Sequence, residues 1–194
     1  GGIAVGSYAG QNTQSAYSVA LGYEAGQGSA TAGDVQGTHA VAIGYQAGKT
    51  LQSLSGVAIG RGTGQTSQGN YSVAIGHTSG ATSQGNQSVA IGTLAGYTSQ
   101  GGSSVAIGTS TGKTSQGGTA VAIGNNAGVT SQGAGSVGVG YYAGGTLQGI
   151  NSVAIGYQAA TNDQGLQAVA IGSSSGRLQQ ALYGIAIGAN AAEF

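Results

Sequence analysis

A four-residue phrase recurs twelve times along this 194-residue chain: a β-branched residue, a small residue, an aliphatic residue and then glycine. The copies begin at Ile3, Val19, Val41, Val57, Val73, Val89, Val105, Val121, Val137, Val153, Val169 and Ile185. Ten of the eleven intervals between them are 16 residues, and the other is 22. So short and regular a period is typical of a solenoid in which each repeat forms one coil. The sequence therefore predicts one repeat domain over residues 1–194, built from twelve coils.

The pattern within one repeat predicts two short strands. With the first residue of the phrase as position 0, large residues stand at positions 0 and 2 and small ones at positions 15, 1 and 3, as in 72–76. This alternation has the period of a strand. Thr-Ser-Gln-Gly follows at positions 9–12 in five copies, for example 82–85, and its Thr favours a second strand. Glycines at positions 3 and 7 indicate a corner between them. We therefore expect an all-β fold, a parallel β-solenoid in the form of a two-sheet β-roll.

The phrase also raises the question of which side chains fill the roll. We expect the Val and Ile side chains to face its interior and the Ala side chains to lie at a seam between chains, because side-chain volume must hold two sheets apart. With so few large side chains per coil, a single roll would be only marginally stable. The small-residue column and the low charge favour association with other chains.

Position 11 is glutamine in every complete repeat. Identical amides stacked at the strand spacing can form a hydrogen-bonded ladder. We interpret the column as such a structural ladder, with a periodic polar surface for a ligand as the alternative. The members assigned to the ladder are Gln36, Gln52, Gln68, Gln84, Gln100, Gln116, Gln132, Gln148 and Gln164, with Gln14 and Gln180 in the same column.

The single long interval contains a six-residue insertion, 28–33, which we place at a turn because a solenoid tolerates insertions there. We expect it to form a plain surface bulge, although it could also be a contact site. The chain starts at Gly1 rather than Met, so we interpret it as a fragment or a processed product.

Charge and composition argue against most chemistry. Lys and Arg number four, Asp and Glu number four, and the net charge is zero, so the chain offers no basic surface for nucleic acid. The acids are scattered, Cys is absent, and His39 and His77 stand in different columns. We therefore expect no catalytic residues, no metal site and no cofactor, and hence not an enzyme. No apolar run approaches the roughly 18 residues that a membrane-spanning helix needs.

Tyrosines are the bulky residues outside the strand phrase. Four of them occupy position 4, directly after the corner glycine: Tyr23, Tyr45, Tyr141 and Tyr157. A tyrosine combines a flat apolar ring with a polar tip, which suits glycans and protein partners. We therefore take these four as candidate binding residues. The alternative is that they only cover the edge of the roll or a subunit seam.

Several phrases resemble a known family. The segments 72–76, 88–92, 104–108 and 152–156, all Ser-Val-Ala-Ile-Gly, are similar to the head repeats of trimeric autotransporter adhesins, the YadA-like heads. Tyr-Gln-Ala-Gly at 45–48 and Tyr-Gln-Ala at 157–159 resemble similar repeats in phage and viral tail-fibre proteins. The resemblance implies a left-handed parallel β-roll, a homotrimer and a place on a bacterial or virion surface. It also implies attachment to a host-cell protein or glycan, or to a matrix.

This sequence departs from the adhesin pattern in two respects. The adhesin repeat is usually nearer 14 residues, whereas this one is 16, and no neck, heptad stalk or membrane anchor follows. Two other functions stay open. An ice-binding solenoid would use the Thr column at position 9, which comprises Thr50, Thr66, Thr82, Thr98, Thr114, Thr130 and Thr146. A depolymerase is the weakest, because no pair of acids or nucleophile is in place.

Overall fold

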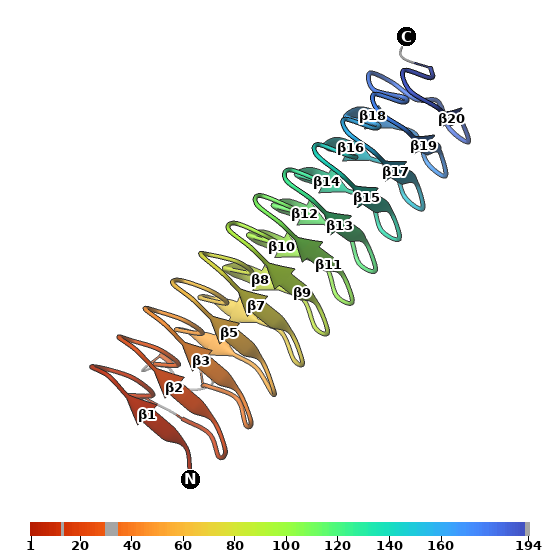
Figure 1. Ribbon diagram of the computed structural model, residues 1–194. Helices are drawn as coiled ribbons and strands as arrows, with labels where there is room; N and C mark the ends of the chain where they lie inside the picture. The colour runs from red at the N-terminus through yellow and green to blue at the C-terminus, as the bar shows by residue number, and fades with distance from the viewer. Residues whose placement is uncertain (13, 30–34, 193–194) are drawn as a thin grey trace.

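The computed structural model describes residues 1–12, 14–29 and 35–192, and it shows the chain wound into a straight stack of coils (Figure 1). The two termini lie at opposite ends of the rod, and each coil sits directly on the one before it. The described residues contain strands and turns but no helix. The predicted all-β parallel solenoid is therefore confirmed.

Each copy of the Val-Ala-Ile-Gly phrase forms a strand, and these twelve strands make the first sheet. The strands lie in the sheet in the same order as in the chain, and the twelve strands delimit eleven turns of the solenoid. The strands are β1 (Ile3–Val5), β2 (Val19–Leu21), β3 (Val41–Ile43), β5 (Val57–Ile59), β7 (Val73–Ile75), β9 (Val89–Ile91), β11 (Val105–Ile107), β13 (Val121–Ile123), β15 (Val137–Val139), β17 (Val153–Ile155), β19 (Val169–Ile171) and β20 (Ile185–Ile187).

The segments that end in the column glutamine, five of them Thr-Ser-Gln, form the second, eight-stranded sheet. It is shorter than the first sheet, because near both ends the Gln residues form only isolated bridges, such as Gln164 with Gln180. Its strands are β4 (Leu51–Gln52), β6 (Ser67–Gln68), β8 (Thr82–Gln84), β10 (Thr98–Gln100), β12 (Thr114–Gln116), β14 (Thr130–Gln132), β16 (Thr146–Gln148) and β18 (Asn162–Gln164).

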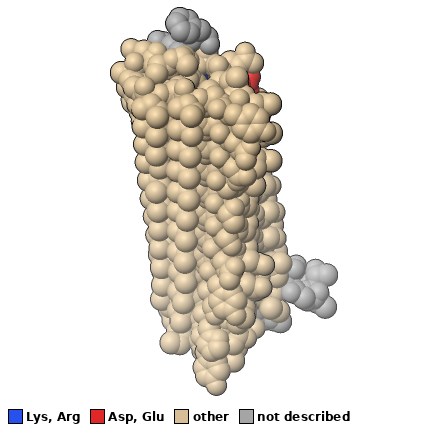
Figure 2. All heavy atoms as spheres, turned by 90° about the vertical axis from the view of Figure 1, so that its right-hand side faces the viewer, with Lys and Arg blue, Asp and Glu red and all other residues tan. Residues whose placement is uncertain are grey.

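All neighbouring strands are parallel and in register, so equivalent residues of successive coils lie side by side. In the first sheet Ala106 pairs with Ala122, and in the second Gln100 pairs with Gln116. Figure 2 shows the consequence, straight columns of atoms along a face of the rod that carries almost no charge. Equivalent positions of successive coils thus form straight columns along the rod.

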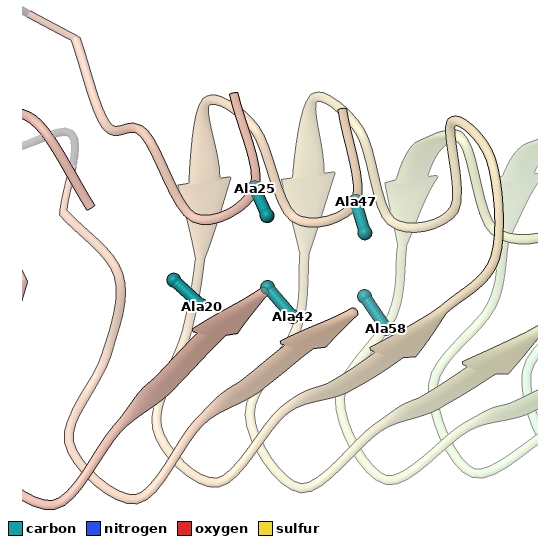
Figure 3. Packing of buried hydrophobic residues seen from close by; sticks show 5 residues of the cluster. All are labelled: Ala20, Ala25, Ala42, Ala47 and Ala58. Atoms are coloured by element: carbon teal, nitrogen blue, oxygen red, sulfur yellow. The ribbon is translucent and has the colours of Figure 1, made fainter. Parts of the chain in front are cut away.

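The interior of the roll is built from alanine, which contradicts our expectation that Val and Ile would fill it. Ala20, Ala42 and Ala58 of the first sheet are fully buried and pack with Ala25 and Ala47 of the facing turns (Figure 3). Successive side chains of a strand point to opposite faces, so an inward Ala turns the flanking Val and Ile outward. The sheets do not need branched side chains to hold them apart, because glutamine side chains span the interior.

The corner glycines are required by space as well as by conformation. Gly76, at position 3, has φ +132°, and a Cβ added there would lie 2.6 Å from the carbonyl oxygen of Gly92 in the next coil. Gly96, at position 7, has φ +53°, and an added Cβ would lie 2.6 Å from Oε1 of Gln100. Position 3, which is glycine in all twelve copies, therefore excludes a side chain, whereas at position 7 alanine replaces glycine in two copies, Ala160 and Ala192.

Other turn positions adopt the left-handed conformation without glycine. Positions 5, 10 and 14 do so repeatedly, as Gln46 (φ 55°), Ser99 (φ 55°) and His39 (φ 59°) illustrate. This conformation costs a non-glycine residue roughly 1–2 kcal/mol, so the hydrogen bonds of each coil to the next must hold it in place. The residue types at these positions do not predict the left-handed conformation.

Residues 30–33 of the predicted insertion lie outside the described residues. On its near side, the Gly28 amide donates a 2.8 Å hydrogen bond to the carbonyl oxygen of Lys49 in the next coil. The regular stacking of main chain thus continues up to Gly28.

Candidate functional site: columns of side chains on the roll

The glutamine column lies inside the roll. From Gln36 to Gln180 its members are at most 6% exposed. In every coil Nε2 donates to the main-chain carbonyl of the residue at position 0, at 2.7–2.9 Å. Each glutamine therefore joins the second sheet to the first within its own coil. Buried to this degree, the amides are not accessible to a ligand.

Amide-to-amide hydrogen bonds between coils occur at three places in this column. Nε2 of Gln36, Gln116 and Gln164 lies 3.2, 3.0 and 3.1 Å from Oε1 of the glutamine in the next coil. Between the other pairs of successive coils, the amide's main contact is the hydrogen bond from Nε2 to the main-chain carbonyl at position 0. The column thus acts first as a tie between the two sheets and second as a ladder along the rod.

The candidate tyrosines form two separate stacked pairs. The rings of Tyr23 and Tyr45 lie 5.3 Å apart and 12° from parallel, and those of Tyr141 and Tyr157 lie 5.2 Å apart and 10° from parallel. All four side chains are exposed on the surface of the roll. Stacking follows from the register, because position 4 of one coil lies over position 4 of the next.

The first pair is extended in both directions. Tyr8 meets Tyr23 edge-on at 5.8 Å, and the guanidinium of Arg61 lies 5.8 Å from the ring centre of Tyr45. The same guanidinium lies 3.2 Å from Nε2 of His77. Because ring faces are covered by these neighbours, the stack presents hydroxyl groups and ring edges to a partner rather than open aromatic faces.

A charged pair borders this stack. The Glu24 carboxylate lies 2.7 Å from Nζ of Lys49 and accepts a 2.8 Å hydrogen bond from the amide of Gln46. Hydrogen bonds from Lys49 and Gln46 lower the pKa of Glu24, and the negative charge of Glu24 raises the pKa of Tyr23. This ion pair could not be predicted from the sequence, since Glu24 and Lys49 are 25 positions apart and only the stacking of the coils brings them together.

The outer face of the first sheet is aliphatic along its whole length. Val occupies position 0 and Ile position 2 in most strands, and both side chains point away from the alanine interior. Ile107, Ile123, Ile155 and Ile171 are 36–38% exposed in the single chain. A contiguous apolar surface of this kind marks a site of interaction. We call these two columns the aliphatic face.

The outer face of the second sheet is polar and uncharged in its middle. Thr82, Thr98, Thr114 and Thr130 are direct neighbours in register, and serine follows each of them.

Within the described residues, no group of three His, Cys, Asp or Glu side chains could hold a metal ion. The same residues include no helix long and apolar enough to cross a membrane.

The model of the YadA head domain repeat matches two parts of the chain, residues 67–95 and 148–175. These segments are YadA-like head repeats. Each match contains two consecutive strands of the first sheet, β7 with β9 and β17 with β19. The resemblance to YadA-like head repeats is therefore confirmed. No curated protein and no solved structure matches the chain significantly.

The YadA head is a structural adhesin family rather than an enzyme family. Heads of this kind form trimers and are exposed on a surface. The two matched segments of this chain are thus repeats of an adhesin type.

Proposed function

We propose that this chain is a structural and receptor-binding segment of a trimeric surface fibre that attaches to a cell or a matrix. The fibre stands on a virion or on a bacterial cell. The observation that carries the proposal is the aliphatic face, together with the YadA-like head repeats at 67–95 and 148–175. The chain takes a structural role without cofactor or catalytic chemistry.

The aliphatic face supports assembly because it is unbroken and almost free of charge. Val105 and Ile107 stack on Val121 and Ile123, and the same pairing repeats from β1 to β20. Each side chain removed from water contributes roughly 25 cal/mol per Å² of apolar area. Repeated along twelve strands, this contribution favours burial of the face between chains over exposure. Three copies of the face meeting along one axis would close the assembly.

The two tyrosine pairs are the proposed receptor contacts. Tyr23 and Tyr45 lie near the N-terminal end of the rod, and Tyr141 and Tyr157 lie in later coils. Their hydroxyl groups can donate and accept hydrogen bonds, which suits a glycan or a polar protein surface. Replacing a pair by phenylalanine keeps the stack but removes the hydroxyl groups. Binding to host cells that survives both Tyr-to-Phe pairs would remove these residues from the proposal.

The first experiment is the absolute mass of the particle in solution, measured by light scattering on a size-exclusion column. We expect three chains of 18.4 kDa each. A single chain at all concentrations would overturn the trimeric fibre. It would leave the aliphatic face without an occupant.

A second candidate is an ice-binding solenoid, which one observation favours. The Thr column from Thr82 to Thr146 lies outward on a regular parallel sheet, with equivalent residues directly opposite one another. Thermal hysteresis and ice shaping at roughly millimolar protein are the test. Absence of both effects would end this candidate, and their loss in a Thr98→Tyr and Thr114→Tyr double variant would support it.

A further inference from the structure

The repeat pattern breaks toward the C-terminal end of the second sheet, as it also does at the N-terminal end with Leu51 and Leu54. Along position 10, the serines of the middle coils give way to Leu147, Asp163 and Gln179 in three successive coils. Along position 13, they are joined by Ile150, Leu166 and Leu182, where the middle coils carry Asn, Gly or Ala. In a repeat protein, a binding site needs positions that differ from the repeat, and this end of the sheet provides them on two adjacent columns.

Four of these side chains line a hollow of about 470 Å³: Leu147, Asp163, Gln179 and Leu182. Residues 164–165 and 180–181 complete its lining. Leu147 is 53% exposed and Leu182 59% exposed, so its walls are aliphatic side chains open to solvent. We call this hollow the distal groove. It lies beside β16 and β18, near the C-terminal end of the rod in Figure 1.

The charge of the distal groove is negative. Asp163 contributes a carboxylate between the aliphatic walls and is exposed. It forms no salt bridge within the described part of the chain. A partner that covered the groove with apolar groups alone would remove this carboxylate from water without compensation, which is costly. The groove therefore favours a partner that brings a cation with its apolar groups.

The position of the groove keeps it accessible in the proposed fibre. It opens on the outer face of the second sheet, whereas the aliphatic face belongs to the first sheet on the other side of the alanine interior. Assembly through the aliphatic face would leave the groove on the outside of the fibre. This step rests on the proposed function. The geometry of the groove itself does not.

We propose that the distal groove binds an extended segment of a receptor protein in which Lys or Arg alternates with aliphatic side chains. The aliphatic side chains would contact Leu147 and Leu182, and the cation would pair with the Asp163 carboxylate. One such contact is small and therefore weak. Three copies on one fibre would raise the apparent affinity by multivalent attachment.

The test measures fluorescence anisotropy of three labelled hexapeptides with the wild-type protein. One peptide alternates Leu and Lys, the second alternates Leu and Glu, and the third alternates Ser and Lys. We expect the Leu-Lys peptide to bind about tenfold more tightly than either of the others. Equal binding of the three peptides, or no binding of the first at millimolar protein, would overturn the proposal.

Two variants locate the binding on the chain. Asp163→Asn should weaken the Leu-Lys peptide about five- to tenfold and abolish the salt dependence of its binding. Leu182→Ser should weaken it to a similar extent with the salt dependence retained. Ser115→Asn, at position 10 in the middle of the rod, is the matched control and should change nothing. Unchanged binding by Asp163→Asn would refute the charge pairing.

The same samples separate this inference from the proposed trimer. If the particle is a single chain but Leu-Lys binding follows the expected pattern, only the fibre assembly fails. If Leu182→Ser lowers the mass of the particle, then the groove is filled by a second copy of this chain. That result would overturn the receptor segment as its occupant.

Discussion

The side-chain amide of Gln100 donates a 2.8 Å hydrogen bond to the main-chain carbonyl of Val89 across the interior of the roll. Gln100 belongs to the second sheet and Val89 to the first, and Gln100 is 2% exposed. The bond is thus a tie between the two sheets that repeats in every coil. Four predictions about the stability and assembly of the protein follow from this and related contacts.

Replacing Gln100 by Leu should lower the free energy of unfolding by roughly 1–3 kcal/mol, because the buried carbonyl of Val89 loses its side-chain donor. Denaturant unfolding followed by circular dichroism measures this. Thr98→Val, on the outer surface of the same strand, is the control and should change stability by less than about 0.5 kcal/mol. A Gln100→Leu protein as stable as wild type would show that the tie between the sheets contributes nothing.

Gly76→Ala should destabilise the protein by more than about 2 kcal/mol, since the methyl group meets the Gly92 carbonyl and the φ of +132° is unfavourable for alanine. Gly62→Ala is the matched change, at φ +62° in a position where other coils carry side chains. There we expect roughly 1–2 kcal/mol, the cost of the left-handed conformation alone. The measurement is the fall in melting temperature of Gly76→Ala and of Gly62→Ala relative to wild type, and we expect the larger fall for Gly76→Ala. Equal shifts would mean that the close approach of Gly92 has no energetic consequence.

A lysine in the aliphatic face should break the assembly. Ile107→Lys would place an ammonium group where the proposed interface excludes water, at a cost of several kcal/mol in each subunit. We expect the mass from light scattering to fall from three chains to one. Thr114→Lys, on the outer face of the second sheet, should leave three chains. Retention of the trimer by Ile107→Lys would place the interface elsewhere on the roll.

Stability near the N-terminal end of the rod should depend on pH through Glu24. The pKa of Glu24 is lowered in the folded protein from its ordinary value of 4.5, chiefly by the hydrogen bond from Lys49. Its contribution is therefore present above pH 4.5 and is lost as the pH falls through the lowered value. Amide hydrogen exchange of residues 24–49 in wild type and Glu24→Gln should differ near pH 7 and converge as the pH falls through the lowered pKa of Glu24. A difference that is constant with pH would exclude the charge of Glu24 as its cause.

The period and the strand phrase were sufficient to predict the architecture. The twelve copies of the phrase form the twelve strands of the first sheet, and the five Thr-Ser-Gln segments form five of the eight strands of the second. Gly76 shows why: a residue that alone fits the main-chain geometry of a corner must recur wherever that corner recurs. Regular stacking makes each coil repeat the solution of its neighbour, so local pattern and global fold agree.

The direction of the side chains could not be read from the same pattern. An alternation of Val, Ala and Ile is equally compatible with either face being inside, and a volume argument chose the wrong one. The structure places Ala42 inside and Ile43 outside, because glutamine side chains span the interior and leave room for methyl groups alone. The aliphatic face, on which the proposed assembly depends, follows from this reversal.

Sequence by itself determined the repeat, the two strands per coil, the corners and the kinship with YadA-like heads, because each is a property of residues close together in the chain. Only the tertiary structure decided which residues of different coils become neighbours. It stacked Tyr23 on Tyr45, paired Glu24 with Lys49 and gathered Leu147, Asp163 and Leu182 around one hollow. Residues 16 or more positions apart become neighbours only when one coil settles on another, and the register of that contact is a property of the folded stack.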